Sequence, residues 1–183
     1  MNITRVAITG STGLAGAITA ALTRETDSGR SRGSTGGVAV TNFRLEDDIR
    51  PEDYDIFVNQ AHKGFAQTDL LFRFFEAWKA DPGKYIINIS SRAAQPNISK
   101  GYLYSAQKAA LNHLAANLAY NSEKRCRITT VNLGLLEHAL PSLSYSEVAD
   151  AVKELTLLPA HIEIADMTLQ HAANYCDVQA RKG

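Results

Sequence analysis

Short apolar runs alternate with longer segments of helical periodicity along this chain. The short runs, several of them apolar at consecutive positions, predict buried strands at 5–9, 38–41, 55–59, 85–90, 127–133 and 161–165. The longer segments carry four apolar stripes at helical spacing: Leu14, Ile18, Ala21 and Leu22; Leu70, Leu71, Phe74, Phe75 and Trp78; Leu111, Leu114, Ala115, Leu118 and Ala119; and Val148, Val152 and Leu155. Strands and helices that alternate in this way predict a doubly wound α/β fold, with helices on both faces of a parallel sheet.

Composition fits one globular domain over residues 1–183, in which 45% of the side chains are hydrophobic and 21% are charged. Nineteen basic and nineteen acidic side chains balance, so no net charge favours nucleic acid or an anionic membrane as a partner. No stretch reaches the roughly 20 apolar residues of a membrane-spanning helix, and the N-terminus does not resemble a secretion signal. We therefore expect a soluble, cytoplasmic protein.

The cysteines and histidines indicate no metal site. Cys126 and Cys176 are fifty residues apart, without a CxxC spacing or a nearby histidine pair, so we interpret both as reduced thiols. The five histidines also lack metal-ligand spacing and are interpreted as surface or packed side chains.

Three glycines mark the junction between the first strand and the first helix. Gly10, Gly13 and Gly16 allow a tight turn and close approach of the backbone to a pyrophosphate, while the helix N-terminus offers N–H groups to the phosphates. Ser11 and Thr12 could add hydroxyl donors or cap the helix. The spacing differs from G-x-G-x-x-G, so an ordinary glycine-rich turn remains the alternative, but the position after a strand favours dinucleotide binding.

A second group of polar residues accompanies the third predicted helix. Tyr104 and Lys108 are four residues apart, so they share one helix face. A nearby ammonium favours the phenolate and lowers the pKa of a tyrosine, which then becomes a plausible acid or base at neutral pH. Ser91, with Ser90 beside it, ends the strand 85–90, at the sheet edge where ligands bind in open α/β folds.

Together these segments resemble the short-chain dehydrogenase/reductase family. The motifs "TGSTGLAG" (9–16), "NQA" (59–61), "INISS" (87–91) and "YSAQK" (104–108) occur in that family's order. The resemblance implies a Rossmann-like three-layer α/β/α domain, and it implies Tyr104 as general acid/base, Ser91 as the residue that polarises the substrate carbonyl, and Lys108 as a ligand of the nicotinamide ribose. The cofactor-binding residues that it implies are Gly10, Ser11, Thr12, Gly13, Leu14, Gly16, Arg44, Asn59, Gln60, Ala61, Tyr104, Lys108 and Gly134.

The resemblance implies NADP(H) or NAD(H) as the cofactor. Arg44 follows the second strand, where a basic residue suits the 2′-phosphate of NADP(H), and Arg30 and Arg32 are rivals for that role. These residues give a weak preference for NADP(H).

The chain also departs from the family pattern. It is about one strand–helix unit shorter between Gly16 and Asn59, so the second and third strands are expected to be merged into 38–45. No Asn stands where the family has its fourth catalytic residue; Lys63 and His62 are near that place. Gly134 is kept without the usual preceding proline, and the substrate lid is almost absent between Leu135 and Pro141.

The function we expect is hydride transfer between NAD(P)(H) and a small alcohol or carbonyl. Two alternatives remain: a non-catalytic dinucleotide sensor or scaffold with a degenerate substrate site, and an activity like that of a carbohydrate-nucleotide epimerase. The joint presence of Ser91, Tyr104 and Lys108 favours the enzyme. By resemblance we also expect a homodimer or homotetramer that pairs through the helices at 68–80 and 104–121, the first of which is rich in aromatic residues.

Overall fold

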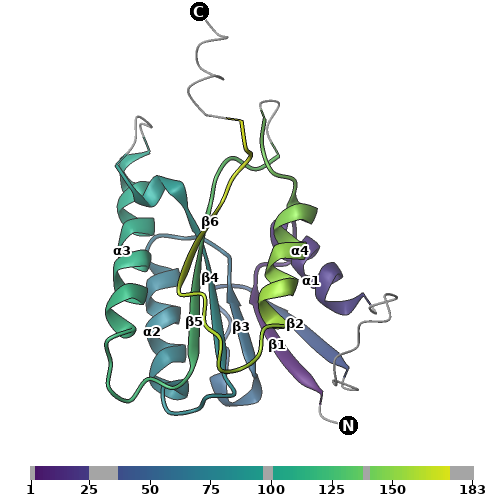
Figure 1. Ribbon diagram of the computed structural model, residues 1–183, viewed down its shortest axis with the longest axis vertical. Helices are drawn as coiled ribbons and strands as arrows, with labels where there is room; N and C mark the ends of the chain where they lie inside the picture. Colours follow the sequence, from purple (N-terminus) through teal and green to yellow (C-terminus); the bar gives the residue numbers. More distant parts are fainter. Residues whose placement is uncertain (1–2, 25–36, 97–100, 138–140, 174–183) are drawn as a thin grey trace, which may run out of the picture.

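The computed structural model describes residues 3–24, 37–96, 101–137 and 141–173, and its elements follow the predicted alternation (Figure 1). The strands are β1 (Thr4–Thr9), β2 (Val38–Phe43), β3 (Ile56–Asn59), β4 (Tyr85–Ser91), β5 (Arg127–Leu133) and β6 (Asp166–Leu169). The α-helices are α1 (Leu14–Thr23), α2 (Ala66–Trp78), α3 (Tyr102–Leu118) and α4 (Tyr145–Thr156), and two 3-10 turns are η1 (Pro51–Asp53) and η2 (Arg92–Ala94).

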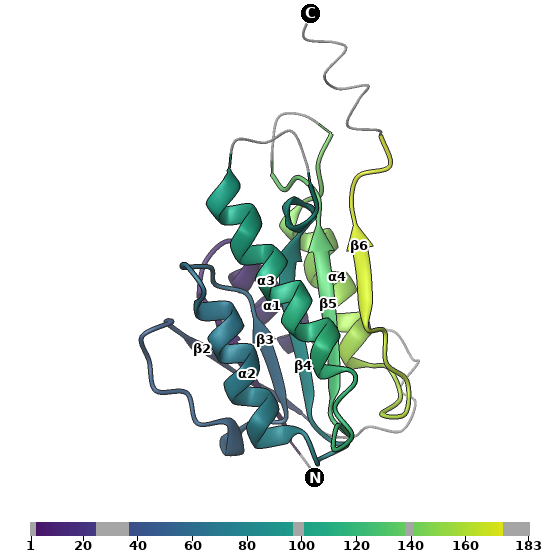
Figure 2. The ribbon, with the colours of Figure 1, turned by 90° about the vertical axis from the view of Figure 1, so that its left-hand side faces the viewer.

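All six strands are parallel and form one sheet in the order β2-β1-β3-β4-β5-β6. Helices α1 and α4 cover one face of the sheet, and α2 and α3 cover the other (Figures 1 and 2). The predicted Rossmann-like, three-layer α/β/α fold is confirmed. Of the described strands, only β2 lies beyond β1, in agreement with the shortened segment between the first helix and Asn59.

The predicted helical stripes form the two cores. The α1 and α4 stripes pack with Ile8, Ile87 and Val131 on one face of the sheet. On the other face, the rings of Phe57 and Phe74 stack with centroids 3.7 Å apart. All residues of the four stripes are buried except two in α3's segment, Leu114, which is partly buried, and Ala119, which is exposed.

The aromatic residues of α2 lie mainly inside the molecule. Phe74, Phe75 and Trp78 are buried, and the Trp78 indole N–H donates to the backbone oxygen of Pro51 at 3.1 Å. Only Phe72, of the aromatic residues in this helix, is exposed. The aromatic richness of α2 therefore serves the core, and it does not by itself indicate a subunit contact.

The predicted strand at 161–165 is wrong. These residues are exposed and unpaired in the structure, and the last strand is β6, which begins at Asp166. The N–H of Thr130 donates to the oxygen of Ala165 at 2.9 Å, so pairing with β5 starts where the predicted strand ends. The short run that contains Ile162 and Ile164 predicted a buried strand, but these side chains are 40% and 37% exposed.

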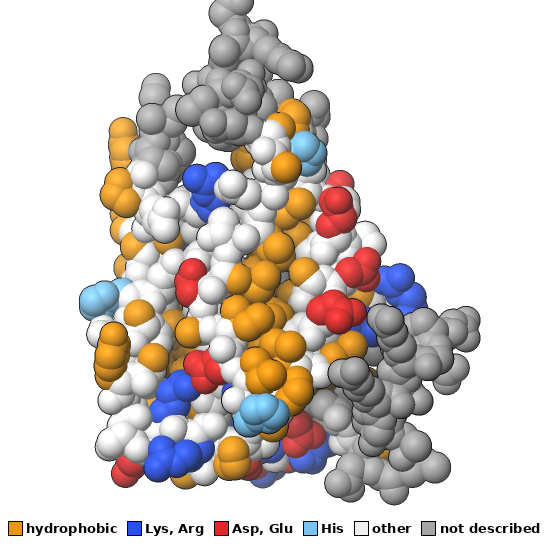
Figure 3. Space-filling view, viewed as in Figure 1, with side chains coloured by type: hydrophobic (Ala, Val, Ile, Leu, Met, Phe, Trp, Pro, Cys, Tyr) orange, Lys and Arg blue, Asp and Glu red, His pale blue; other side chains and the backbone are white. Residues whose placement is uncertain are grey.

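Hydrophobic side chains gather along the middle of the face seen in Figure 3, over the region of β6 and α4. Among the side chains that pack against the core on the α4 side of the sheet, Leu158, Met167 and Leu169 are only partly buried. The reason is that β6 is an edge strand whose own outer side has no neighbouring strand among the described residues.

No helix in the described part of the chain is long and apolar enough to cross a bilayer.

We expect Phe74→Ala to lower the free energy of unfolding by about 3–5 kcal/mol, because the change leaves a cavity beside Phe57 and Trp78. Phe72→Ala is the matched control, since this side chain is 52% exposed on the same helix and its loss should change stability by less than about 1 kcal/mol. Urea unfolding followed by Trp fluorescence measures both. Equal losses in the two variants would contradict the assignment of Phe74 to the core.

Candidate functional site

The glycine loop lies between β1 and α1, at the carboxyl edge of the sheet. Gly10 and Gly13 have positive φ angles of 96° and 55°, which side chains other than glycine rarely adopt. A Cβ at Gly10 would lie 2.8 Å from Oε1 of Gln60, and one at Gly16 would lie 3.3 Å from the backbone oxygen of Ser11. The loop therefore requires glycine for its conformation at Gly10 and Gly13, and for close packing at Gly16.

The first turn of α1 has no side-chain cap. Gly13 is the N-cap residue, and no side chain caps the helix, so the suggestion that Ser11 or Thr12 caps it is wrong. The reason is the position of the start: the helix begins two residues after Thr12, and both hydroxyl residues lie exposed in the loop. Their hydroxyls remain available for a ligand, as do the helix N–H groups that this turn presents. Leu14, in contrast, is buried in the core.

A buried threonine joins the glycine loop to the "NQA" segment. The Oγ1 atom of Thr9 accepts the backbone N–H groups of Gln60 at 2.8 Å and Ala61 at 2.9 Å. Because Thr9 is the last residue of β1 and Asn59 the last of β3, this pair of bonds fixes the two loops against each other. The predicted cofactor residues of both loops are thus brought together.

The end of β2 lies against the same loop. Gly10 donates its N–H to the oxygen of Phe43 at 2.7 Å, and the amide of Asn42 donates to the oxygen of Gly10 at 2.7 Å. Arg44 follows directly and is exposed, while its backbone N–H donates to Asp47 at 2.7 Å. The structure places Arg44 next to the glycine loop, whereas Arg30 and Arg32 lie outside the described residues.

Tyr104 and Lys108 meet on α3, as their spacing predicts. The Lys108 Nζ atom lies 5.7 Å from the centroid of the Tyr104 ring, which is 39% exposed. Lys108 itself is only 4% exposed, and burial lowers the pKa of its ammonium to about 8. Its Nζ donates to Oε1 of Gln67 at 2.6 Å and to the oxygen of Ile89 at 2.9 Å. The ammonium is therefore held by neutral oxygens.

Gln67, on the first turn of α2, is the residue that sequence reasoning missed. Its Nε2 donates to the backbone oxygens of Asn59 at 2.8 Å and Ile89 at 3.1 Å, so one amide links β3, β4 and Lys108. Asn59 donates back to the oxygen of Gln67 at 2.8 Å. A signal was present: Gln67 lies three residues before Leu70 and so falls on the buried stripe of α2, where a polar side chain needs a partner.

The two serines at the end of β4 have different surroundings. Ser90 donates to Oδ1 of Asn112 on α3 at 2.5 Å and is buried. Ser91 ends the strand, is half-buried, and accepts the N–H of Ala93 at 3.1 Å through its Oγ. This arrangement leaves Ser91, and not Ser90, at the edge beside the candidate site. Its part in catalysis stays a prediction.

A series of side-chain hydrogen bonds that the sequence did not predict runs from Asn112, the partner of Ser90, to the edge of the sheet. Asn112 donates to Asn132 at 2.7 Å, and Asn132 donates to Asp166 at 2.8 Å. These bonds tie α3 to β5 and to the start of β6. Sequence reasoning missed this chain because its members are far apart along the sequence.

His62 follows the "NQA" segment and packs edge-on against Tyr104, with ring centroids 4.9 Å apart. Partial burial lowers the pKa of His62, and the positive charge of Lys108 lowers it further. The imidazole is therefore uncharged at neutral pH and adds no second cation beside the phenol. Sequence reasoning interpreted it as a surface or packed histidine, and the structure shows it beside the predicted catalytic tyrosine.

Gly134 lies at the end of β5, where it allows β6 to approach. It donates its N–H to the oxygen of Leu169 at 2.8 Å, and a Cβ there would lie 2.9 Å from Cβ of Gln170. The Gln170 side chain in turn accepts a hydrogen bond from Arg92, the residue after Ser91. The structure explains Gly134 by strand packing, so its contact with a cofactor stays a prediction.

Hydrogen bonds join the two ends of the segment in which the substrate lid was expected to be almost absent. Leu143 donates its N–H to the oxygen of Leu135 at 2.9 Å, and Glu137 donates to the oxygen of Leu143 at 3.0 Å. Residues 138–140, between them, lie outside the described part of the chain.

The cysteines and histidines form no metal site in the described ranges. Cys126 is buried and free, and burial raises the pKa of its thiol to about 11, whereas Cys176 is not among the described residues. Within those ranges, no group of His, Cys, Asp and Glu could hold a metal ion.

These residues fit a dinucleotide. The positive φ angles at Gly10 and Gly13 and the uncapped first turn of α1 form a loop that presents backbone N–H groups and two exposed hydroxyls. Arg44 lies at one end of this loop, and Tyr104 and Lys108 follow along the same edge of the sheet.

The buried ammonium predicts a pH-dependent stability. Lys108 loses its proton near pH 8 in the folded chain and near 10.5 in the unfolded chain, so the unfolded chain binds more protons between these values. The free energy of unfolding of the wild type, relative to Lys108→Met, should therefore be lowest and constant below about pH 8. It should rise by roughly 3 kcal/mol toward pH 10.5. Urea unfolding across this range measures the difference, with exposed Lys63→Met as control; parallel curves for wild type and Lys108→Met would refute it.

Comparison with solved structures reproduces the fold. The chain is similar to serine dehydrogenase from Escherichia coli (19% identity, 93% of this chain and 99% of that chain, TM-score 0.66). It is also similar to an alcohol dehydrogenase from the archaeon Thermococcus sibiricus complexed with 5-hydroxy-NADP (16% identity, 94% and 98%, TM-score 0.72). A third structure is the NADH-dependent reductase A1-R′ complexed with NAD (17% identity, 92% and 95%, TM-score 0.61).

No curated protein matches the chain with significance. The family description "short chain dehydrogenase" matches residues 37–144, more than half of the chain, including the "NQA", "INISS" and "YSAQK" segments. The predicted family is confirmed, and the chain belongs to the short-chain dehydrogenase family.

Proposed function

We propose that this protein is an NAD(P)(H)-dependent oxidoreductase that interconverts a small alcohol and its carbonyl, with Tyr104 as general acid/base. The observation that carries the proposal is the position of the Lys108 ammonium, 5.7 Å from the Tyr104 ring, at the sheet edge that also holds the glycine loop. Family membership supports an oxidoreductase in general. The geometry supports the particular residues.

The cofactor-holding residues would be the loop Gly10–Gly16 for the pyrophosphate, Asn59–Ala61 for the adjacent ribose, and Lys108 for the nicotinamide ribose. A nicotinamide cofactor supplies the hydride donor or acceptor when bound. The neighbours crystallised with NAD or with an NADP derivative support this class of cofactor. Exposed Arg44, beside the loop, favours NADP(H) because a guanidinium can pair with a 2′-phosphate.

The protein residues would then handle the proton and the orientation of the substrate. The Tyr104 hydroxyl would give a proton to, or take it from, the substrate oxygen, with the Lys108 ammonium 5.7 Å from the centroid of its ring. Ser91, half-buried at the end of β4, would donate its hydroxyl to the same oxygen. With a pKa of about 8, Lys108 supplies this charge at neutral pH and loses it above pH 8.

A dinucleotide sensor or scaffold is the second candidate, and one observation favours it. Lys108 is buried, and its Nζ already has two short hydrogen bonds, to Gln67 and Ile89. Contact between this ammonium and a ribose is therefore limited to the third N–H of a side chain that is only 4% exposed. A sensor would bind the dinucleotide through the glycine loop without using Lys108.

Assembly, location and domain count stay predictions. We propose a homodimer through α2 and α3, with the exposed apolar side chains of Tyr102 and Leu103 on α3. Light scattering that shows a monomer at tens of micromolar protein, an order of magnitude for such assays, would contradict it. A cytoplasmic location and one domain over residues 1–183 are likewise proposed from the sequence.

Tyr104→Phe should lower turnover by roughly 10²–10⁴, because it removes the ionisable oxygen and keeps the ring. Cofactor affinity and the free energy of unfolding should change little, since the side chain is 39% exposed. The assay is NAD(P)H oxidation with a panel of small carbonyls, and Tyr120→Phe, an exposed residue beyond the end of α3, is the control. Equal turnover by the wild type and Tyr104→Phe would remove Tyr104 from the mechanism; binding without turnover in every protein would favour the sensor.

Gly16→Val should abolish dinucleotide binding without unfolding the chain. Its Cβ would already lie 3.3 Å from the oxygen of Ser11, so the added methyl groups must push the loop away from α1. Gly37→Val is the matched control, because no atom lies within 4 Å of a Cβ at Gly37 in the described part of the chain. NADH and NADPH fluorescence titration reports affinity, and circular dichroism reports folding. Unchanged affinity in folded Gly16→Val would exclude the glycine loop as the binding site.

A further inference from the structure

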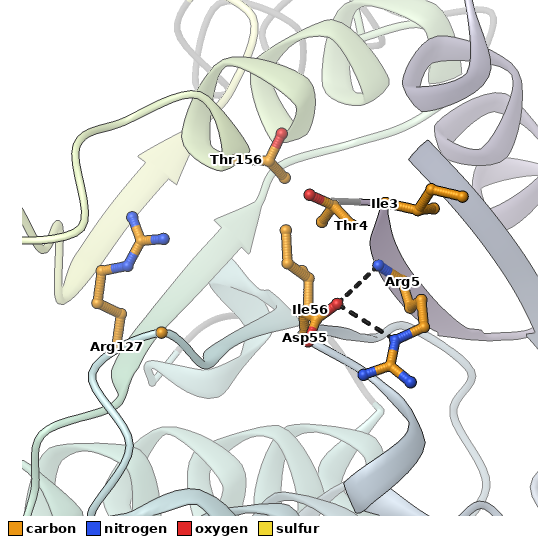
Figure 4. A pocket seen from close by; sticks show the side chains of 8 residues that line it. Ile3, Thr4, Arg5, Asp55, Ile56, Arg127 and Thr156 are labelled. Atoms are coloured by element: carbon orange, nitrogen blue, oxygen red, sulfur yellow. Dashed lines mark hydrogen bonds and ion pairs between the residues drawn. The ribbon is translucent and has the colours of Figure 1, made fainter. Parts of the chain in front are cut away.

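A polar pocket lies at the edge of the sheet opposite to the candidate functional site, where the strands begin (Figure 4). It has a volume of about 520 Å³ and lies under the first residues of β1, β3 and β5 and the last residue of α4. Its lining residues are Ile3, Thr4, Arg5, Asp55, Ile56, Gly83, Arg127 and Thr156. The glycine loop and Tyr104 belong to the carboxyl edge, so the two sites are separated by the length of the strands, roughly 20 Å.

Arg127 is the unusual residue of this pocket. It is only 8% exposed, yet its Nη1 donates to a neutral group, the backbone oxygen of Leu158, at 3.2 Å. Its buried Nε has no hydrogen-bond partner among the described residues. The guanidinium lies 4.1 Å from the centroid of the Tyr85 ring, which holds its plane in place. A buried guanidinium without an ion pair is costly unless something compensates its charge.

The acidic groups nearby already have other partners. Asp55 accepts from the N–H and Nε of Arg5 at 2.9 and 3.5 Å, and it also pairs with Lys84 at 3.0 Å. Glu163, whose charge acts on Arg127 from outside the lining, pairs with Lys124 at 2.6 Å. Among the residues that line the pocket, Arg5 and Arg127 against Asp55 leave an excess of one positive charge.

Figure 4 shows how these charges are arranged. Arg127 lies on one side of the pocket and the Arg5–Asp55 pair on the other, with Thr4 and Ile56 between them. Thr4 adds a hydroxyl that carries no charge, whereas the Thr156 hydroxyl already donates to the backbone oxygen of Lys153 at 2.7 Å. A guanidinium with an unpartnered N–H beside a polar pocket is a group that an oxyanion prefers.

We propose that this pocket binds the phosphate or carboxylate group of a small metabolite, with Arg127 as its main ligand. The oxyanion would take the open donors of Arg127 and would be shared with Arg5 across the pocket. Such a ligand would bind at the starts of β1, β3 and β5 in the folded chain only, and would therefore stabilise the fold by RT ln(1 + [L]/Kd). The proposal does not depend on the proposed oxidoreductase activity, because it uses none of that site's residues.

Inorganic phosphate, with sodium succinate and sodium acetate as the carboxylate arms, tests the proposal at constant ionic strength. Thermal unfolding and isothermal titration calorimetry of the full chain measure binding. We expect one of these oxyanions to raise the melting temperature, and Arg127→Met to weaken its binding by about 10-fold to 100-fold. A response to phosphate alone identifies a phosphate ligand, and a response to the carboxylates identifies a carboxylate ligand.

Three variants determine whether the anion binds in this pocket or elsewhere on the chain. Arg73→Met removes an exposed arginine from α2, where it pairs with Asp48, and should leave binding unchanged. Gly16→Val disrupts the other candidate anion site and should also bind normally. Arg5→Gln, whose side chain is 49% exposed, provides the test if Arg127→Met fails to fold, and should weaken binding. Equal binding by the wild type and the pocket variants, or no binding of any of these anions at 50 mM, about the upper limit for a physiological metabolite, would overturn the proposal.

Discussion

The parallel direction of all six strands is the constraint on which the rest of the structure depends. Each connection must return the chain to the amino edge of the sheet, so every strand delivers its last residue to the carboxyl edge. Gly10, Asn59 and Ser91 are far apart in sequence, yet each directly follows or ends a strand and reaches the same edge. The Thr9 hydroxyl then fixes two of these loops together. The position of the site therefore follows from the strand topology and from the hydrogen bonds to this one buried oxygen.

The buried ammonium of Lys108 is the main electrostatic feature at that edge. Carbonyl and amide oxygens hold it, so its charge acts on the neighbouring Tyr104 ring without competition from a hydrogen-bonded anion among the described residues. A carboxylate in place of Gln67 would stabilise the ammonium better and would raise the pKa of Lys108, but it would also neutralise the positive charge beside Tyr104. The neutral amide thus holds the lysine in place and leaves its charge unpaired.

The sequence predicted those parts of the structure that local patterns determine. The strands, the helical stripes, the glycine loop and the Tyr104–Lys108 pair all arise from periodicity or from a fixed spacing within one element. Gln67 was missed because its partners are backbone oxygens on two other strands, and a list of motifs contains no such contact. The error at 161–165 has a related cause: a short apolar run indicates a strand nearby, but only the neighbouring β5 determines which four residues pair.

Because β6 lies at the edge of the sheet, its local stability differs from that of the central strands. This strand pairs only with β5, over four residues, and its side chains are at most partly buried. Strand β4 is paired on both sides and buried for six of its seven residues. Amide hydrogens of β6 can therefore exchange through a local opening that leaves the rest of the sheet intact, whereas those of β4 exchange only when the whole fold is lost. The carboxyl-edge loops beside β6 therefore adjoin a strand that can open locally. The hydrogen bonds of Lys108 instead involve β4, which opens only on global unfolding.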